Sequence, residues 1–140
     1  MTTNAEETRE GLGNEQLATL RDLRNRLLHL HKSLLDMERQ NFEKKSGRVT
    51  TGELLQLLIN HTQFAWLRII TALLVEIDEV LNGEMPATLT DFEDLLTQAR
   101  LLFTSPGNQE FRINYQNALQ REPSVVMAHS AVMQLLRQDH

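Results

Sequence analysis

The sequence predicts an all-α protein, folded as an antiparallel helical bundle in a single domain over residues 14–140. Three observations support this fold class. Leucine dominates the apolar residues, and aromatic residues, which strands favour, make up only 5% of the chain. Apolar positions recur at spacings of three and four residues. The 6 glycines and 3 prolines interrupt the apolar pattern rarely enough for long helices to form.

The first helix is expected over residues 14–45, after a polar, acidic segment, residues 1–13, that predicts a disordered tail. Ser46 and Gly47 are expected to end this helix. Its apolar residues form one row typical of a bundle core and a second row that widens it. The two rows consist of Leu20, Leu23, Leu27, Leu30, Leu34 and Met37, and of Leu28, Leu35 and Phe42.

The second helix is expected over residues 50–82. Thr50 and Glu53 have the spacing of a capping box, and Val49 with Leu54 has the spacing of a hydrophobic staple. Gly83 is expected to end the helix in a left-handed conformation. At 1.5 Å per residue, each of the first two helices is on the order of 45–50 Å long. Their short connection predicts a long antiparallel hairpin.

Three shorter helices are expected to pack on this hairpin, over residues 90–104, 108–121 and 124–138. Thr90 and Glu93 predict a capping box for the first of them. Pro123 separates the last two, because proline interrupts a helix. These short helices are not long enough to cover the hairpin individually. Apolar surface on the second helix is therefore expected to stay uncovered, at Phe64, Leu67, Leu74 and Val75.

Composition excludes several functional classes. The chain has no cysteine, which excludes disulfides and thiolate chemistry. Its net charge of −5 makes nucleic-acid binding an unfavoured function. No apolar run is long enough to cross a membrane or to serve as a signal peptide, so a cytoplasmic location is expected. Basic residues crowd positions 21–48 and acidic residues positions 76–94, and the two segments are expected to meet in the folded chain.

Polar residues also occur on apolar helix faces. Arg24, His31 and Glu38 are seven residues apart and project into the leucine face of the first helix. Glu76 projects into the core of the second helix, where an ion pair with Arg24 is predicted, and His129 projects inward from the last helix. Such groups usually form a polar layer that fixes helix register. The alternative is a metal or small-ligand site formed by His31, Glu38, Glu76 and His129.

The string Arg24-Asn25-Arg26-Leu27-Leu28-His29 resembles the Arg-Asn-x-x-x-His motif of HEPN domains, which are helical bundles. The resemblance implies a metal-independent ribonuclease in which Arg24 and His29 form the catalytic pair and Asn25 supports them. Helical periodicity places His29 opposite the core, on the solvent side.

The interpretation that these observations favour is a non-enzymatic protein–protein interaction module or a homo-oligomer such as a homodimer. The long helices and their uncovered apolar surface support this interpretation. No catalytic residue, metal site or cofactor is favoured. The HEPN-like ribonuclease with Arg24, Asn25 and His29 and the ligand-binding bundle with its interior polar residues remain the two alternatives.

Overall fold

The computed structural model describes residues 11–105 and 107–138, and over these residues every regular element is a helix. The expected disordered tail lies outside the described residues, apart from residues 11–13, of which Leu12 is half-buried against the core. The elements are α2 (Asn14–Ser46), α3 (Thr51–Asn60), the 3-10 helix η1 (Thr62–Leu67), α4 (Arg68–Asn82), α5 (Leu89–Thr104), α6 (Gln109–Arg121) and α7 (Pro123–Leu136).

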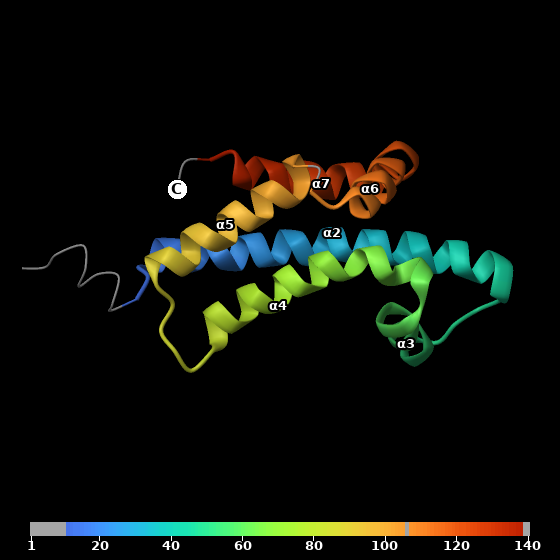
Figure 1. Cartoon of the computed structure of the whole chain (residues 1–140), viewed down its shortest axis with the longest axis horizontal. Coiled ribbons are helices and arrows are strands. Elements are labelled where there is room, and N and C mark those ends of the chain that lie inside the picture. Colours follow the sequence, from blue (N-terminus) through green and yellow to red (C-terminus); the bar gives the residue numbers. More distant parts are fainter. Residues whose placement is uncertain (1–10, 106, 139–140) are drawn as a thin grey trace, which may run out of the picture.

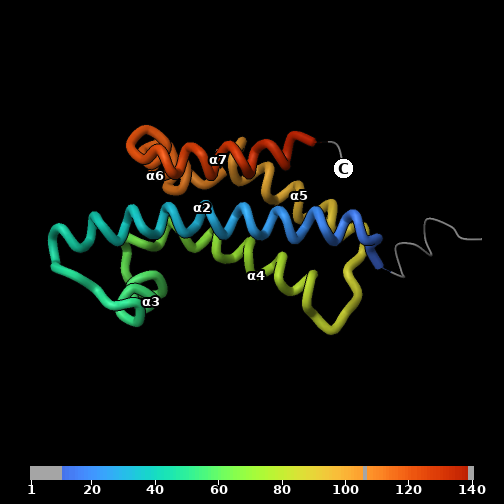
Figure 2. Tube along the Cα trace, turned by 180° about the vertical axis from the view of Figure 1, so that it is seen from behind, coloured from blue at the N-terminus to red at the C-terminus, as the bar shows by residue number. Residues whose placement is uncertain are grey.

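Helix α2 is the central element, with α4 and η1 on one side and α7 on the other (Figures 1 and 2). Its expected leucine row is confirmed, because all five leucines are fully buried: Leu20, Leu23, Leu27, Leu30 and Leu34. In the second row Leu35 and Phe42 are half-buried, whereas Leu28 is 47% exposed and does not belong to the core. The contacting face of α2 is therefore narrower than the sequence predicts.

Helix α5 crosses from the side of α4 to α7, as Figure 1 shows. Its far end is tied to α7 by the guanidinium of Arg100, which donates from Nε to the carbonyl of Leu136 at 3.0 Å. Helix α7 begins at Pro123, where proline fits because the first helical N–H has no partner in the helix. The predicted break between the last two helices is thus present at Pro123.

The single second helix predicted over residues 50–82 is wrong, because the chain leaves helical geometry at His61. His61 has φ −93° and ψ 136°, and its Nδ1 accepts a hydrogen bond from the Gln63 N–H at 3.1 Å. The following residues form η1, which buries Phe64 and Trp66 against the core. Burial of two large aromatic side chains stabilises this break, since each removes a large apolar area from water.

Helix ends differ from expectation at two places. The Thr50–Glu53 capping box is confirmed, but α5 is capped by Thr88 and Asp91, two residues before the predicted pair Thr90 and Glu93. Both pairs have the same Thr-x-x-acid spacing, so the sequence alone did not distinguish them. The predicted left-handed conformation of Gly83 is also wrong, since its φ is −74°.

Glycine is needed at position 83 because the backbone there passes close to the last turn of α4. A Cβ at Gly83 would lie 2.3 Å from the Glu79 carbonyl oxygen, so any other residue would force the helix end to shift. The chain can therefore turn away from α4 tightly at this point and lead into α5.

The surface expected to stay uncovered is mostly buried. Phe64 and Leu67 are fully buried and Leu74 is partly buried, whereas Val75 is 52% exposed. The break at His61 causes this difference, because it turns the side chains of η1 toward α2. In the described part of the chain, no helix has both the length and the apolar character needed to span a membrane.

Candidate functional site

Glu38 is buried, with 8% of its surface exposed, and its carboxylate is fully engaged within the protein. Trp66 Nε1 donates to Oε2 at 2.7 Å, and Gln63 Nε2 donates to Oε1 at 3.2 Å. Asn41 Nδ2 approaches Oε1 at 3.4 Å. A buried carboxylate with three donors supports the fold, since it offsets the cost of leaving water.

Two half-buried histidines each pair with a hydroxyl group. His31 Nε2 lies 3.1 Å from Thr71 Oγ1, and burial lowers the pKa of His31. His129 Nδ1 lies 2.7 Å from the Tyr115 hydroxyl oxygen. Burial and, less strongly, the positive charge of Arg137 lower the pKa of His129, while burial raises the pKa of Tyr115. Burial therefore favours the neutral form of both imidazoles.

Arg24 forms its ion pair with Asp78, at 3.3 Å, and not with Glu76 as the sequence predicts. Glu76 is exposed to solvent rather than buried in the core. The physical reason is again η1: a 3-10 helix has 3.0 residues per turn, so the residues after it are rotated relative to one continuous α-helix. The residue that faces Arg24 is consequently Asp78.

Three of the four residues of the predicted ligand site have separate partners, and the fourth is exposed. Glu38 binds side chains of η1 and α2, His31 binds Thr71 of α4, and His129 binds Tyr115 of α6. Glu76 lies on the surface. Within residues 11–105 and 107–138, no three His, Asp or Glu side chains are grouped so that they could hold a metal ion.

The residues of the HEPN-like motif point in different directions. Arg24 is half-buried in its ion pair with Asp78, whereas Asn25 and His29 are exposed. Five residues along an α-helix correspond to a rotation of about 140°, which separates Arg24 from His29. One copy of this chain therefore does not direct both side chains at a common substrate.

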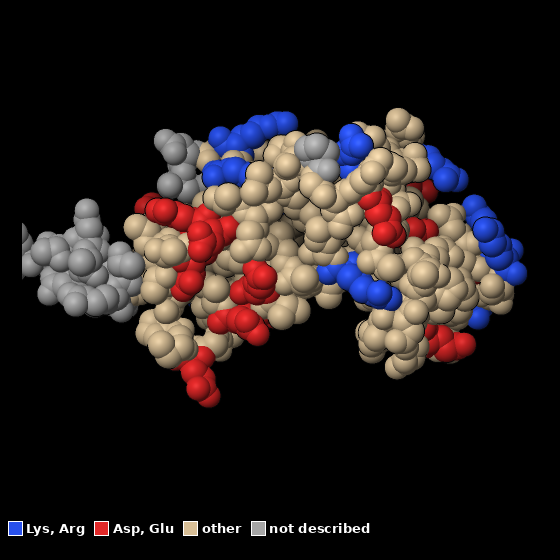
Figure 3. All heavy atoms as spheres, viewed as in Figure 1, with Lys and Arg blue, Asp and Glu red and all other residues tan. Residues whose placement is uncertain are grey.

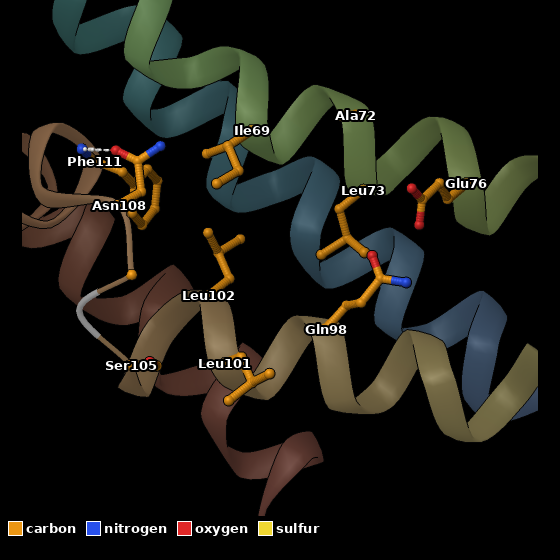
Figure 4. Close-up of a pocket in the computed structure, with 11 residues that line it drawn as sticks. Ile69, Ala72, Leu73, Glu76, Gln98, Leu101, Leu102, Ser105, Asn108 and Phe111 are labelled. Atoms are coloured by element: carbon orange, nitrogen blue, oxygen red, sulfur yellow. Dashed lines mark hydrogen bonds between the residues drawn. The ribbon is translucent and has the colours of Figure 1, made fainter.

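A groove of about 520 Å³ lies between α4 and α5, and the first residues of α6 close it at one end. Figure 4 shows side chains from both helices directed into it. Ile69 and Leu73 come from α4, Leu102 comes from α5, and Phe111 comes from α6. The floor is apolar, and Leu101 on the α5 side is 53% exposed.

The two ends of this groove differ. Asn108 caps α6, since its Oδ1 accepts a hydrogen bond from the Phe111 N–H at 3.0 Å (Figure 4). At the other end the groove continues into a hollow of about 310 Å³ that shares Glu76 and Gln98 with it. We call the two parts together the α4–α5 groove.

The second part of the groove is acidic. Its lining includes four carboxylates, on Glu76, Glu79, Asp91 and Asp94, and no lysine or arginine of residues 11–105 and 107–138 lines either part. Figure 3 shows acidic side chains gathered over this end of the molecule. The expected meeting of the basic and acidic segments is limited, among the described residues, to the Arg24–Asp78 pair.

Sequence reasoning did not find the α4–α5 groove. One signal was present, namely the acidic stretch without a basic residue, but the sequence predicted that the basic segment would meet it in the folded chain. A second signal was Leu101, which falls outside the spacing of three and four residues that joins Leu95, Ala99 and Leu102 on the same helix. Comparison of the chain with protein-family models, curated proteins and solved structures finds no match.

Proposed function

We propose that this protein is a non-enzymatic interaction module that binds an amphipathic helix of a partner protein in the α4–α5 groove. The observation that carries the proposal is an apolar floor, formed by Ile69, Leu73 and Leu102, that is open to solvent beside the exposed Leu101. An open apolar groove between two helices is a common way to bind a third helix.

The dimensions of the groove fit such a ligand. From Ile69 to Val80, the lining residues of α4 extend roughly 17 Å at 1.5 Å per residue. This length matches about three turns of a partner helix, with apolar residues at spacings of three and four facing the floor. In this proposal the antiparallel arrangement of α2 with α4 and α7 is the scaffold that holds the groove in place.

In this proposal the interior polar groups have a structural role, and the groove is the binding site. Glu38, His31 and His129 are each hydrogen-bonded to another side chain of the protein. The described lining of the groove contains no histidine, and its polar side chains surround an apolar floor. This composition favours binding of an apolar surface over proton transfer.

The test uses a fluorescein-labelled, uncharged synthetic peptide of 14 residues, with leucine at positions 1, 4, 8 and 11 and alanine or glutamine elsewhere. Its affinity for the full chain is measured by fluorescence anisotropy. We expect Leu101→Glu to weaken binding at least about tenfold, because it places a charge against an apolar ligand. Circular dichroism checks that the variant remains folded.

Val75→Glu is the matched control, since Val75 is 52% exposed on α4 and Leu101 is 53% exposed on α5, but Val75 does not line the groove. We expect this control to bind the peptide like the unmodified chain. Absence of binding to the unmodified chain, or an equal loss in both variants, contradicts the proposed function.

A further inference from the structure

We infer that the partner helix of the α4–α5 groove is basic: it carries lysine or arginine on the turns that lie beside Glu76, Glu79 and Asp94. This inference rests on the proposed function and specifies the chemistry of the partner. It is carried by a different observation, which is the distribution of charge along the groove.

The carboxylates of the groove have no compensating charge in the described chain. Glu76 and Glu79 come from α4, and Asp94 comes from α5, so both walls of the acidic part carry negative charge. None of the three forms an ion pair within residues 11–105 and 107–138. Between Arg68 and Arg100 the sequence contains no lysine, arginine or histidine.

Asp91 differs from these three residues, because its carboxylate accepts a hydrogen bond from the Thr88 N–H at 3.0 Å and caps α5. Its charge nevertheless contributes to the same hollow. The negative potential of a hollow rises when several like charges line it, and a cationic ligand is attracted before contact.

Part of the chain's own basic segment is engaged away from the groove, because Arg24 pairs with Asp78 and three further basic side chains pair along α2. Ion pairs join Arg26 to Asp22 at 2.9 Å and Lys32 to Asp36 at 3.1 Å, each one turn apart on the same helix. Arg39 contacts Glu43 in the same way, at 3.6 Å. These pairs hold four basic side chains of residues 21–48 away from Glu76, Glu79 and Asp94.

A second copy of this chain is a poor occupant of the groove. In a two-fold symmetric dimer the same surface lies on both sides of the contact. Such a dimer would bring two acidic grooves into one interface, and among the described residues neither lining offers a lysine or an arginine to pair with Glu76 or Asp94. Like charges across an interface oppose association, so the geometry points to a different, basic partner.

Charge also fixes the position of the ligand along the groove. The apolar part, around Leu73 and Leu102, receives the apolar residues of the partner helix, and the part around Glu76 and Asp94 receives its basic residues. A helix bound in the opposite sense would leave its basic side chains over the apolar floor, where desolvation of charge is costly. The groove therefore selects one orientation.

The experiment compares three labelled peptides that share the leucine positions of the uncharged peptide. One peptide carries three lysines in its last two turns, one carries three glutamates there, and one carries glutamines. Anisotropy titrations use the full chain at low and at high salt. We expect the lysine peptide to bind about threefold to thirtyfold more tightly than the glutamine peptide, and the difference to shrink at high salt.

The double variant Glu76→Gln, Asp94→Asn removes two charges of the groove, and we expect it to abolish most of the preference for lysine. The control variant Glu93→Gln, Glu110→Gln removes two exposed charges that do not line the groove, and we expect it to keep the preference. Residues 93 and 94 are neighbours, so this comparison separates the groove from general attraction by an acidic protein.

The outcomes distinguish the two proposals. If the glutamine peptide binds in the groove but the lysine peptide binds no better, the proposed function stands and the basic partner is excluded. The same conclusion follows if the double variant keeps the full preference. If no peptide binds the unmodified chain, the proposed function itself fails. Binding of the glutamate peptide more tightly than the lysine peptide overturns this inference.

Discussion

Two regions on the same side of α2 differ in how far their charged and apolar side chains are buried and paired within the chain. Around η1, the carboxylate of Glu38 accepts hydrogen bonds from three side chains, and Trp66 is 5% exposed. Along the α4–α5 groove, Leu101 is 53% exposed and the carboxylate of Glu76 has no ion pair in the described chain. The carboxylate of the first region has its partners within the chain, whereas the groove is open to solvent.

This difference separates structural from functional polar residues. A buried carboxylate persists in a fold only when its partners offset the desolvation cost, so Glu38 and its donors are tied to stability. An exposed carboxylate beside an apolar groove contributes little to folding and stays available for a ligand. Substitutions in the region around η1 should therefore change stability, and substitutions in the groove should change binding. Four predictions test this contrast, in order of decreasing effect.

The largest effect is expected for Trp66→Ala. It removes a buried aromatic side chain and one donor to Glu38, and the free energy of unfolding should fall by about 3–5 kcal/mol. Urea denaturation measures this change. Leu101→Ala, in the groove, should alter the free energy of unfolding by no more than about 0.5 kcal/mol. Similar losses in the two variants would remove the contrast between the regions.

Glu38→Gln should lower the free energy of unfolding by about 1–3 kcal/mol while keeping the side-chain volume. All three partners of Glu38 are donors, so an amide leaves at least one of them facing an N–H group in either orientation. Glu76→Gln is the control in the groove and should be neutral in denaturation. Equal stability of Glu38→Gln and the unmodified chain would show that the carboxylate is not structural.

Acid should destabilise the fold through His31 and His129. Burial lowers the pKa of both imidazoles below the ordinary value of about 6.5 that they regain on unfolding. The unfolded chain therefore binds protons first, so their contribution is fully present above about pH 6.5 and is lost as the pH falls toward the folded-state pKa values. Denaturation at a series of pH values measures the slope of the free energy of unfolding against pH.

The variant His129→Asn removes one of the two titrating groups and should flatten this slope, whereas His29→Asn replaces an exposed imidazole and should leave it unchanged. A slope that is identical in the unmodified chain and in His129→Asn would contradict the prediction. This experiment also tests the Tyr115–His129 hydrogen bond, because His129→Asn removes the ring nitrogen that lies 2.7 Å from the hydroxyl oxygen.

The smallest effect is expected for Asp78→Asn, which breaks the ion pair with Arg24. Arg24 and Asp78 have side-chain exposures of 27% and 60%, so solvent screens their attraction. The free energy of unfolding should fall by about 0.2–1 kcal/mol at low salt and by less at high salt. Glu79→Gln should have no such effect. A larger loss in Glu79→Gln than in Asp78→Asn would place the ion pair elsewhere on α4.

The sequence by itself determined the all-helical character of the described chain, the leucine row of α2, the cap at Thr50 and the break at Pro123. These features depend on residues close together in the chain: a spacing of three and four residues, a side chain that bonds to an N–H three residues away, and a proline that lacks a donor. Local chemistry of this kind is present in the sequence pattern itself.

Only the tertiary structure decided the break at His61, the partner of Arg24 and the existence of the α4–α5 groove. The break depends on burial of Phe64 and Trp66 and on a hydrogen bond to Glu38, 28 residues before Trp66. The groove depends on how far α5 leans away from α4 toward α7, which no local pattern specifies. Contacts between distant residues set these features, because packing energy depends on the positions of whole helices in space.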